Sequence, residues 1–205
     1  MASKRPPARQ RIFDTAAKLF YRRGIRAVGV DTIADRANTT KMSLYRNFPS
    51  KDNLVAEWLR DHDAKFWRTW DKMAQTYPHD ARKQLQTAFA LLAKHVSDPA
   101  ARGCPMANAA VEITKRDHPA RKIIEAHKSE LRSRLAELCL RAGASQPALL
   151  ADELFLLMEG AQVSIVLGVR GPALKVGRAA DTLIDSHLRR ASACNRTARR
   201  RRRNA

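Results

Sequence analysis

Residues 32–54 constrain the fold of this 205-residue chain more than any other stretch. Ile33 and Ala37 stand four residues apart, so they share one face of a short helix. Asn38 tolerates the left-handed backbone conformation that a tight turn needs, and either of the two threonines that follow it can cap a second helix. The stretch therefore predicts a helix-turn-helix whose second helix runs from about Lys41 to Asn47.

The second helix of this pair is expected to bury one side and expose the other. Leu44 and Phe48 point inward in the predicted register. A major groove accepts an exposed face that carries basic, amide, hydroxyl and flexible apolar groups. A solvated amphipathic helix is the alternative interpretation of the same pattern. The outward residues are Lys41, Met42, Ser43, Tyr45, Arg46 and Asn47.

These residues also resemble a known family. Residues 32–54, with the preceding helix that ends at Gly24, are similar to the DNA-binding domain of the TetR/AcrR family of transcriptional regulators. The resemblance departs from the family pattern at Asn38, where the family usually has glycine, and at Met42, where a small residue is common. A later segment, Gly103-Cys104-Pro105 with its following Asn-Ala-Ala, resembles part of the effector domain in some relatives. The residues that carry the first resemblance are Leu44, Tyr45, Phe48, Pro49, Ser50, Lys51 and Leu54.

The resemblance implies a fold, a function and a set of contacts. The implied fold is all-α, with an N-terminal three-helix helix-turn-helix DNA-binding domain and a C-terminal helical ligand-binding and dimerisation domain. The implied function is that of a sequence-specific transcriptional regulator, a repressor released from its operator by a small molecule. Base edges would be contacted by Lys41, Met42, Ser43 and Arg46, and phosphates by Thr40, Tyr45, Asn47 and Lys51.

Charge is concentrated at the two ends of the chain. The formal net charge is +19, and residues 1–60 carry thirteen Lys and Arg against five Asp and Glu, while residues 196–205 carry six Arg and no acid. This distribution favours a polyanionic partner such as double-stranded DNA. The expected domains are a basic N-terminal arm (1–7), the DNA-binding domain (8–55), the helical effector-binding and dimerisation domain (56–192) and a disordered Arg-rich tail (193–205).

The middle of the chain predicts long helices. One runs from Lys51 to about Thr76 and contains all three tryptophans, and another runs from about Asp80 to Ser97. Core packing explains most of their aromatic residues, but a pocket for a small apolar or aromatic ligand is the alternative. The candidate pocket residues are Phe66, Trp67, Trp70, Met73, Phe89, Met106, Asn108 and Met158.

The last part of the chain predicts a subunit interface. A helix from about Gln146 to Leu167 is apolar on more than one side, and a further helix follows from Pro172 to about Arg190. A homodimer on a near-palindromic operator is expected, because one small reading helix rarely gives enough specificity. The expected interface residues are Leu154, Met158, Ala161, Ile165, Val176, Ala180, Leu183 and His187.

Other classes of function receive less support. Three cysteines without paired spacing favour a reducing cytoplasm, and the chain shows neither a signal peptide nor a membrane span. The resemblance implies a bacterial cytoplasmic protein associated with the nucleoid. No metal site, cofactor or enzymatic activity is predicted. One alternative is a ligand-independent, largely non-specific basic DNA-binding protein. Another is a thiol-based redox sensor or enzyme that uses Cys104, with His118 or His127 as base.

Overall fold

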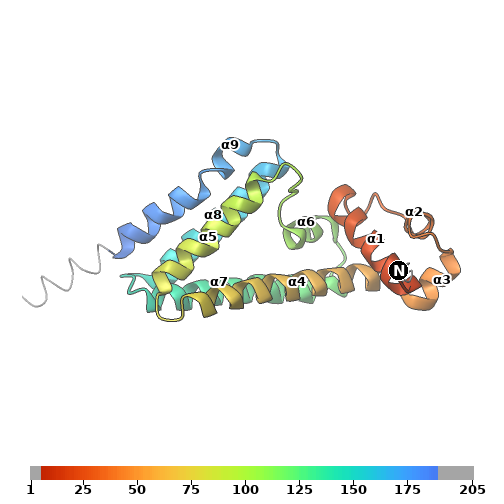
Figure 1. Cartoon of the computed structure of the whole chain (residues 1–205), viewed down its shortest axis with the longest axis horizontal. Helices are drawn as coiled ribbons and strands as arrows, with labels where there is room; N and C mark the ends of the chain where they lie inside the picture. The colour runs from red at the N-terminus through yellow and green to blue at the C-terminus, as the bar shows by residue number, and fades with distance from the viewer. Residues whose placement is uncertain (1–5, 189–205) are drawn as a thin grey trace, which may run out of the picture. The chain divides into compact units, whose positions relative to one another are not determined.

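The computed structural model describes residues 6–188, and all regular structure within that range is α-helical (Figure 1), as predicted. Its contacts divide the chain into two units. The first takes the residues up to Phe66 together with Cys104–His127, and the second takes Trp67–Gly103 and the chain from Lys128 onward. The expected boundary after residue 55 therefore does not follow the contacts. Residues 1–5 of the arm and the whole Arg-rich tail lie outside the described residues.

The first unit is built from three short helices, the first part of a long helix, and a later segment of the chain. Gly24 ends α1 with φ 86°, a conformation that favours glycine. Ser50 caps α4, because its hydroxyl accepts the Asn53 amide proton at 3.0 Å. The elements are α1 (Ala8–Arg23), α2 (Val30–Arg36), α3 (Lys41–Asn47), the start of α4 (Lys51–Thr76), α6 (Pro105–Glu112) and the start of α7 (Ala120–Arg141).

One apolar core joins these elements. Ile12 from α1, Leu44 from α3 and Leu54 from α4 are fully buried in it. Residues from α6 and α7 belong to the same cluster, among them Met106 and Ile124. Burial of this apolar surface, at about 25 cal/mol per Å², makes Cys104–His127 part of the N-terminal core, although at least 37 residues separate it from Phe66 in the sequence.

A buried histidine lies at the start of α7. The ring Nδ1 of His118 accepts the Ala120 amide proton at 3.1 Å. His118 is only 8% exposed, and this bond satisfies an amide that the first turn of a helix leaves without a partner in the helix.

The second unit packs α5 (Ala81–Ser97) against α8 (Pro147–Val166) and the short α9 (Arg170–Ala173), with the later parts of α4 and α7. Asp80 caps α5 by accepting the Lys83 amide proton at 2.8 Å. The predicted helix from Pro172 is instead α9, a turn at residues 174–175, and a helical segment over 176–188.

Arg170 ties α9 to the end of α5. Its guanidinium donates to the carbonyl oxygens of Val96, Asp98, Pro99 and Ala101 at 3.0–3.4 Å. Val96 lies in the last turn of α5, whose carbonyl groups have no partner within the helix, and the other three residues follow it. Within the described range, none of the helices combines the length and apolar character that crossing a membrane requires.

Candidate nucleic-acid interface

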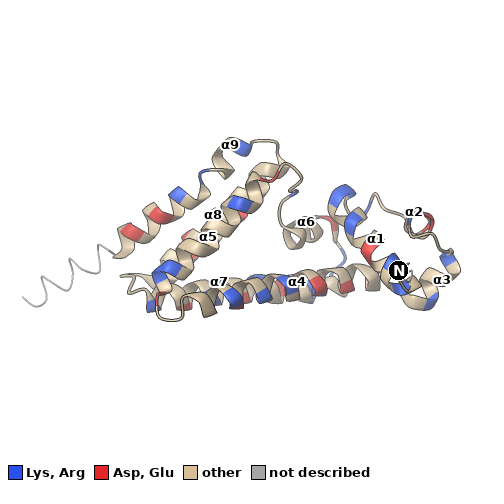
Figure 2. Cartoon of the chain, viewed as in Figure 1, with Lys and Arg blue, Asp and Glu red and all other residues tan. Residues whose placement is uncertain are grey.

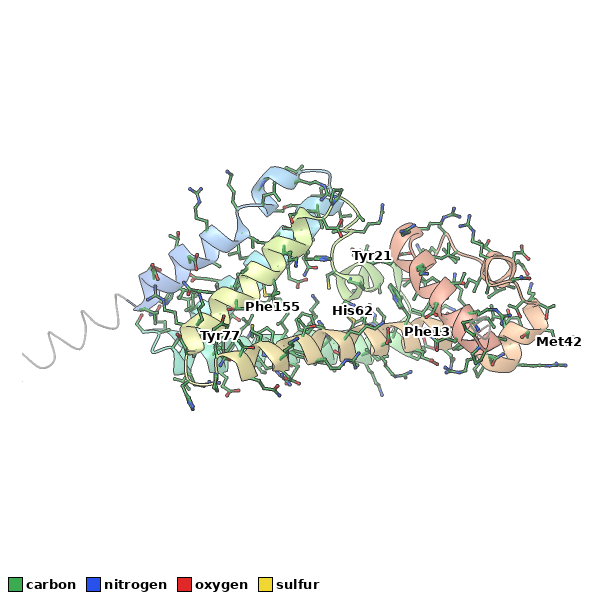
Figure 3. All side chains as sticks on the ribbon, in the orientation of Figure 1. Phe13, Tyr21, Met42, His62, Tyr77 and Phe155 are labelled. Carbon is green, nitrogen blue, oxygen red and sulfur yellow. The ribbon has the colours of Figure 1, made fainter. Side chains whose placement is uncertain are left out.

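Helix α3 presents the outward face that the sequence predicts. Thr40 begins it, and its Oγ1 accepts the Ser43 amide proton at 3.1 Å. Leu44 is fully buried and Phe48 is 1% exposed, so the inward side is anchored in the core. On the other side Met42 is 65% exposed and Tyr45 45% exposed, and Figure 3 has Met42 on the outer side of the helix.

The turn before α3 is held from α1. Asn38 has φ 51°, the left-handed conformation that its residue type allows. Arg11 donates to the carbonyl oxygen of Ala37 through Nε and to that of Asn38 through Nη2, both at 3.1 Å. Arg11 therefore contributes to the site by fixing the turn. No local pattern pointed to it, because these contacts span 26 and 27 residues.

The base-facing candidates lie together on α3, and three of them already have side-chain neighbours. The Lys41 ammonium lies 3.1 Å from the Asp31 carboxylate of α2. The Arg46 guanidinium lies 3.5 Å from the Met42 thioether sulfur, one helical turn earlier. Ser43 is half-buried. Asp31 is thus a further residue of this surface that the sequence reasoning did not identify.

The phosphate-contact candidates divide into two groups. Tyr45 is exposed, and Thr40 is exposed although its hydroxyl also caps α3. Asn47 instead donates from Nδ2 to the Ser43 carbonyl oxygen at 2.8 Å. The Lys51 ammonium donates to the Ile25 carbonyl oxygen at 2.6 Å, and its burial lowers the pKa of Lys51. We call the helix-turn-helix domain, residues 8–55, the reading head. Asn47 and Lys51 therefore stabilise the reading head through bonds within it, in addition to any contact with DNA.

The basic residues of the first unit are not all available to a partner. Figure 2 shows Lys and Arg along α1 and α3. Arg9, however, donates to both carboxylate oxygens of Glu57 at 2.7 Å and lies over the Phe48 ring, 4.8 Å from its centroid. This arginine is committed to holding the start of α1 against α4, which reduces the positive charge that the head offers to DNA.

The candidate pocket residues fall into both units. Met106 is buried and Phe66 and Asn108 are half-buried in the first unit. In the second unit Trp67 is half-buried, and its ring lies 5.9 Å from that of Trp70 and 4.3 Å from the Arg134 guanidinium. The fully inward members of the second unit are Trp70, Met73, Phe89 and Met158.

Most of the expected dimer-interface residues are buried within the second unit. Leu154 and Ala180 are fully buried within the chain itself, Leu183 is half-buried, and His187 lies 3.0 Å from Glu153. The buried members of the expected set pack inside their own unit. A helix that is apolar on two sides does not reveal from its sequence which side its own chain covers. The other buried members of the expected set are Met158, Ala161, Ile165 and Val176.

A different apolar face of α8 is exposed. Leu156 is 68% exposed and Val163 47% exposed. Exposed apolar side chains on one helix mark an interaction surface when they gather in a continuous stripe. We call this set the outer face of α8; it consists of Leu149, Leu156, Val163, Val166 and Leu167.

The cysteines and histidines of the thiol-based alternative have the following surroundings. Cys104 and Cys139 are buried, and burial raises the pKa of the Cys139 thiol to about 12. His118 lies 3.4 Å from Asp52 and His127 2.7 Å from Asp63. Over residues 6–188, the structure groups no three His, Cys, Asp or Glu side chains in a way that could hold a metal ion.

Comparison with protein families matches most of the chain in two parts. Residues 12–58 match the family described as "Bacterial regulatory proteins, tetR family". Residues 81–180 match a "Tetracyclin repressor-like, C-terminal domain".

Curated relatives match over about a quarter of the chain. Over 52 residues the chain is 48% identical to the HTH-type transcriptional repressor KstR2 of Rhodococcus jostii, which is 25% of this chain and 26% of that protein. Over 58 residues it is 36% identical to an HTH-type transcriptional regulator, YvkB, of Bacillus subtilis, which is 28% of this chain and 31% of that protein. The chain thus spans less than a third of the length of these relatives.

Solved structures match over nearly the whole chain. A TetR-family transcriptional regulator from Streptomyces coelicolor superimposes with a TM-score of 0.80 at 28% identity, covering 90% of this chain and 96% of that one. A structure from Streptomyces avermitilis, titled as a TetR transcriptional regulator, gives 0.75 at 26% identity, covering 89% and 98%. Both units therefore have counterparts of the same fold in single chains.

Proposed function

The chain belongs to the TetR family of bacterial regulatory proteins, and from this premise we propose that it is a transcriptional repressor that binds an operator as a homodimer. A small molecule bound to its helical C-terminal part releases it from the operator. The protein would act in the bacterial cytoplasm, on chromosomal DNA. The observation that carries this proposal is the outward face of α3, which combines an anchored inner side with exposed basic, hydroxyl and thioether groups.

The proposed roles of the α3 residues in DNA binding follow from the exposure of their side chains. Arg46 is exposed and flanked by Met42, so its guanidinium is available for two hydrogen bonds to a guanine edge. Lys41 and Ser43 complete the base-facing group. Thr40 and Tyr45 are the proposed phosphate contacts, which fix register without reading sequence. Asn47 and Lys51 support them through their bonds to the Ser43 and Ile25 carbonyl oxygens.

Dimerisation is proposed through the outer face of α8. Its side chains are exposed in the single chain, and their burial against a second copy would remove apolar surface from water. A twofold dimer presents two copies of α3 to two half-sites of a near-palindromic duplex. This supplies the specificity that one short helix lacks.

The proposed ligand is small and apolar or aromatic. The inward candidates of the second unit, Trp70, Met73, Phe89 and Met158, offer rings and thioethers, which pack against such molecules. A ligand that binds one placement of the two α3 helices more tightly than another shifts the population toward that placement. If the favoured separation does not match the operator spacing, the repressor dissociates.

A selection experiment tests the proposal. The full chain is used to enrich duplexes from a random library, and the enriched duplex is then footprinted in the presence of excess non-specific DNA at fixed salt. The expected result is a protected near-palindrome with half-sites about one or more helical turns apart. A panel of apolar and aromatic compounds, scored by loss of the footprint and by tryptophan fluorescence, then identifies the ligand class.

The second candidate function is largely non-specific DNA binding, which the net charge of +19 favours. In that case bulk DNA competes as well as any selected duplex, and no sequence is enriched. Competition at several salt concentrations separates the two functions, because only a sequence-specific protein keeps a preference ratio.

A further inference from the structure

We propose that Glu112, the last residue of α6, is a positioning residue that holds the connector between α1 and α2 and so couples α6 to the reading helix. The inference rests on the proposed function and adds a route of regulation to it. The connector is residues 24–29, which join the end of α1 to the start of α2. All of these residues belong to the first unit.

Glu112 reaches the connector directly. Its Oε2 accepts the Arg26 amide proton at 2.7 Å, 86 residues away in the sequence. A carboxylate that accepts a backbone amide proton forms a short, charge-assisted hydrogen bond, which is stronger than a neutral one. The connector therefore has a side-chain partner that comes from α6.

Gly24 makes room for this carboxylate. A Cβ atom at position 24 would lie 2.9 Å from Oε1 of Glu112, closer than real Cβ contacts come, and 3.1 Å from Oε2. The φ of Gly24, 86°, also disfavours any side chain there. The lack of a Cβ atom at position 24 thus leaves space for the Glu112 carboxylate at the end of α1.

A second charge holds the connector from α4. The Lys51 ammonium donates to the Ile25 carbonyl oxygen at 2.6 Å. Burial lowers the pKa of Lys51, while the nearby Asp52 and, to a smaller extent, Glu112 favour its charged form. Ile25 and Arg26 are adjacent, so one peptide unit binds Lys51 through its carbonyl group and Glu112 through its amide. A peptide unit held at both ends has little freedom to rotate.

The connector leads to the reading helix. Val28 is fully buried, and Gly29 is the residue before α2. Helix α2 packs against α3. A shift of the connector therefore moves α2 and, through it, α3. At the other end Met106 and Ala109 embed α6 in the core of the first unit, so α6 moves as a body with Glu112 at its end.

The consequence is reciprocal coupling. A perturbation that displaces α6 must either break the Glu112 bond to Arg26 or carry the connector with it. By linkage, operator binding at α3 must stabilise α6 to the same extent that α6 stabilises operator binding. This can be measured with operator DNA alone, before any ligand is known.

The experiment measures hydrogen exchange of backbone amides in the full chain, with and without the duplex enriched by selection. Operator binding is expected to slow exchange of the α6 amides over residues 106–112 by about fivefold or more, the lower end of measured couplings. Glu112→Ala should abolish this slowing and weaken operator binding roughly tenfold. Glu112→Gln should restore both, because its amide oxygen can still accept the Arg26 amide proton.

Val111→Ala is the matched control, since this neighbour on α6 is 81% exposed. It should behave as the unchanged protein. Persistence of the operator-induced slowing in folded Glu112→Ala would overturn the coupling role, even with operator binding intact. Absence of any enriched duplex would instead count against the proposed function.

A second measurement covers the case in which Glu112→Ala fails to fold. In the unchanged protein, exchange of the Arg26 amide and of the α6 amides should slow together on addition of operator. An Arg26 amide whose exchange is unaffected, while α3 becomes protected, overturns the proposal.

Discussion

Arg11 and Asn38 are joined by a hydrogen bond from guanidinium to backbone carbonyl oxygen at 3.1 Å, although 27 residues separate them. The bond spans from α1 to the turn of the helix-turn-helix, and a companion bond reaches Ala37. A left-handed residue at the turn has a conformational cost that glycine would avoid. The two bonds from Arg11 offset that cost and fix the direction in which α3 leaves the turn.

Replacement of Arg11 by methionine should therefore weaken both the fold and DNA binding. The variant keeps most of the aliphatic length but loses the donors, and we expect the free energy of unfolding to fall by about 1–3 kcal/mol. Thermal or urea unfolding measures this loss. Arg22→Met removes the same charge from an exposed position on the same helix and should cost little. Equal losses in the two variants would contradict the role given to Arg11.

Replacement of Arg46 by alanine should remove sequence discrimination at one position of the operator. A good bidentate arginine contact contributes about 1–3 kcal/mol against the wrong base. Fluorescence anisotropy with a set of single-substitution duplexes measures this discrimination. Binding to bulk DNA should fall far less. Lys18→Ala removes a charge from an exposed position on α1 and controls for the lost charge. If Lys18→Ala abolishes base discrimination at the same operator position, Arg46 is not the residue that reads it.

Introduction of glutamate at Leu156 or Val163 should prevent dimerisation, because a charge would have to be buried against the second copy. Sedimentation velocity should give a monomer, with helical content unchanged by circular dichroism. Leu140→Glu is the control, since Leu140 is also exposed, at 65%, but lies on α7. A dimer that survives Leu156→Glu and Val163→Glu would exclude the outer face of α8 as the interface.

The Cys139 thiol should make stability fall in alkaline solution. Burial raises its pKa from 9.0 to about 12, so between these values the unfolded chain has released a proton that the folded chain retains. The stabilisation is complete below the lower value and is lost as pH rises through the upper one, with a slope of at most about 1.4 kcal/mol per pH unit. Urea unfolding of Cys139→Ala should give a flatter profile above pH 9. Parallel profiles for the two proteins would rule out this contribution.

Much of the reading head could be predicted because its signals are local. The bounds of α3, the cap at Thr40 and the left-handed Asn38 follow from residue type at a fixed offset. The helix from Lys51 to Thr76 follows from apolar spacing and the proline beyond it. In each case a neighbour within four residues determines the outcome, so one segment contains the needed information.

The features of the fold and of the candidate site that could not be predicted depend on contacts between distant segments of the chain. Nothing near Lys51 in the sequence reveals that the Ile25 carbonyl oxygen binds its ammonium, and nothing near Arg26 points to Glu112. The side of α8 that its own chain covers could not be predicted either. Apolar residues surround that helix, and only the packed structure separates the covered side from Leu156 and Val163.

The discontinuous first unit has a consequence for protein engineering. A graft that transplants only residues up to Phe66 onto another regulator would leave behind Met106, Ala109, Ile113 and Ile124, and with them part of the apolar interior that the three short helices close upon. Such a chimera would expose apolar surface on one side and would aggregate instead of binding DNA. A working exchange of operator specificity must move Cys104–His127 together with the N-terminal segment, or change α3 alone.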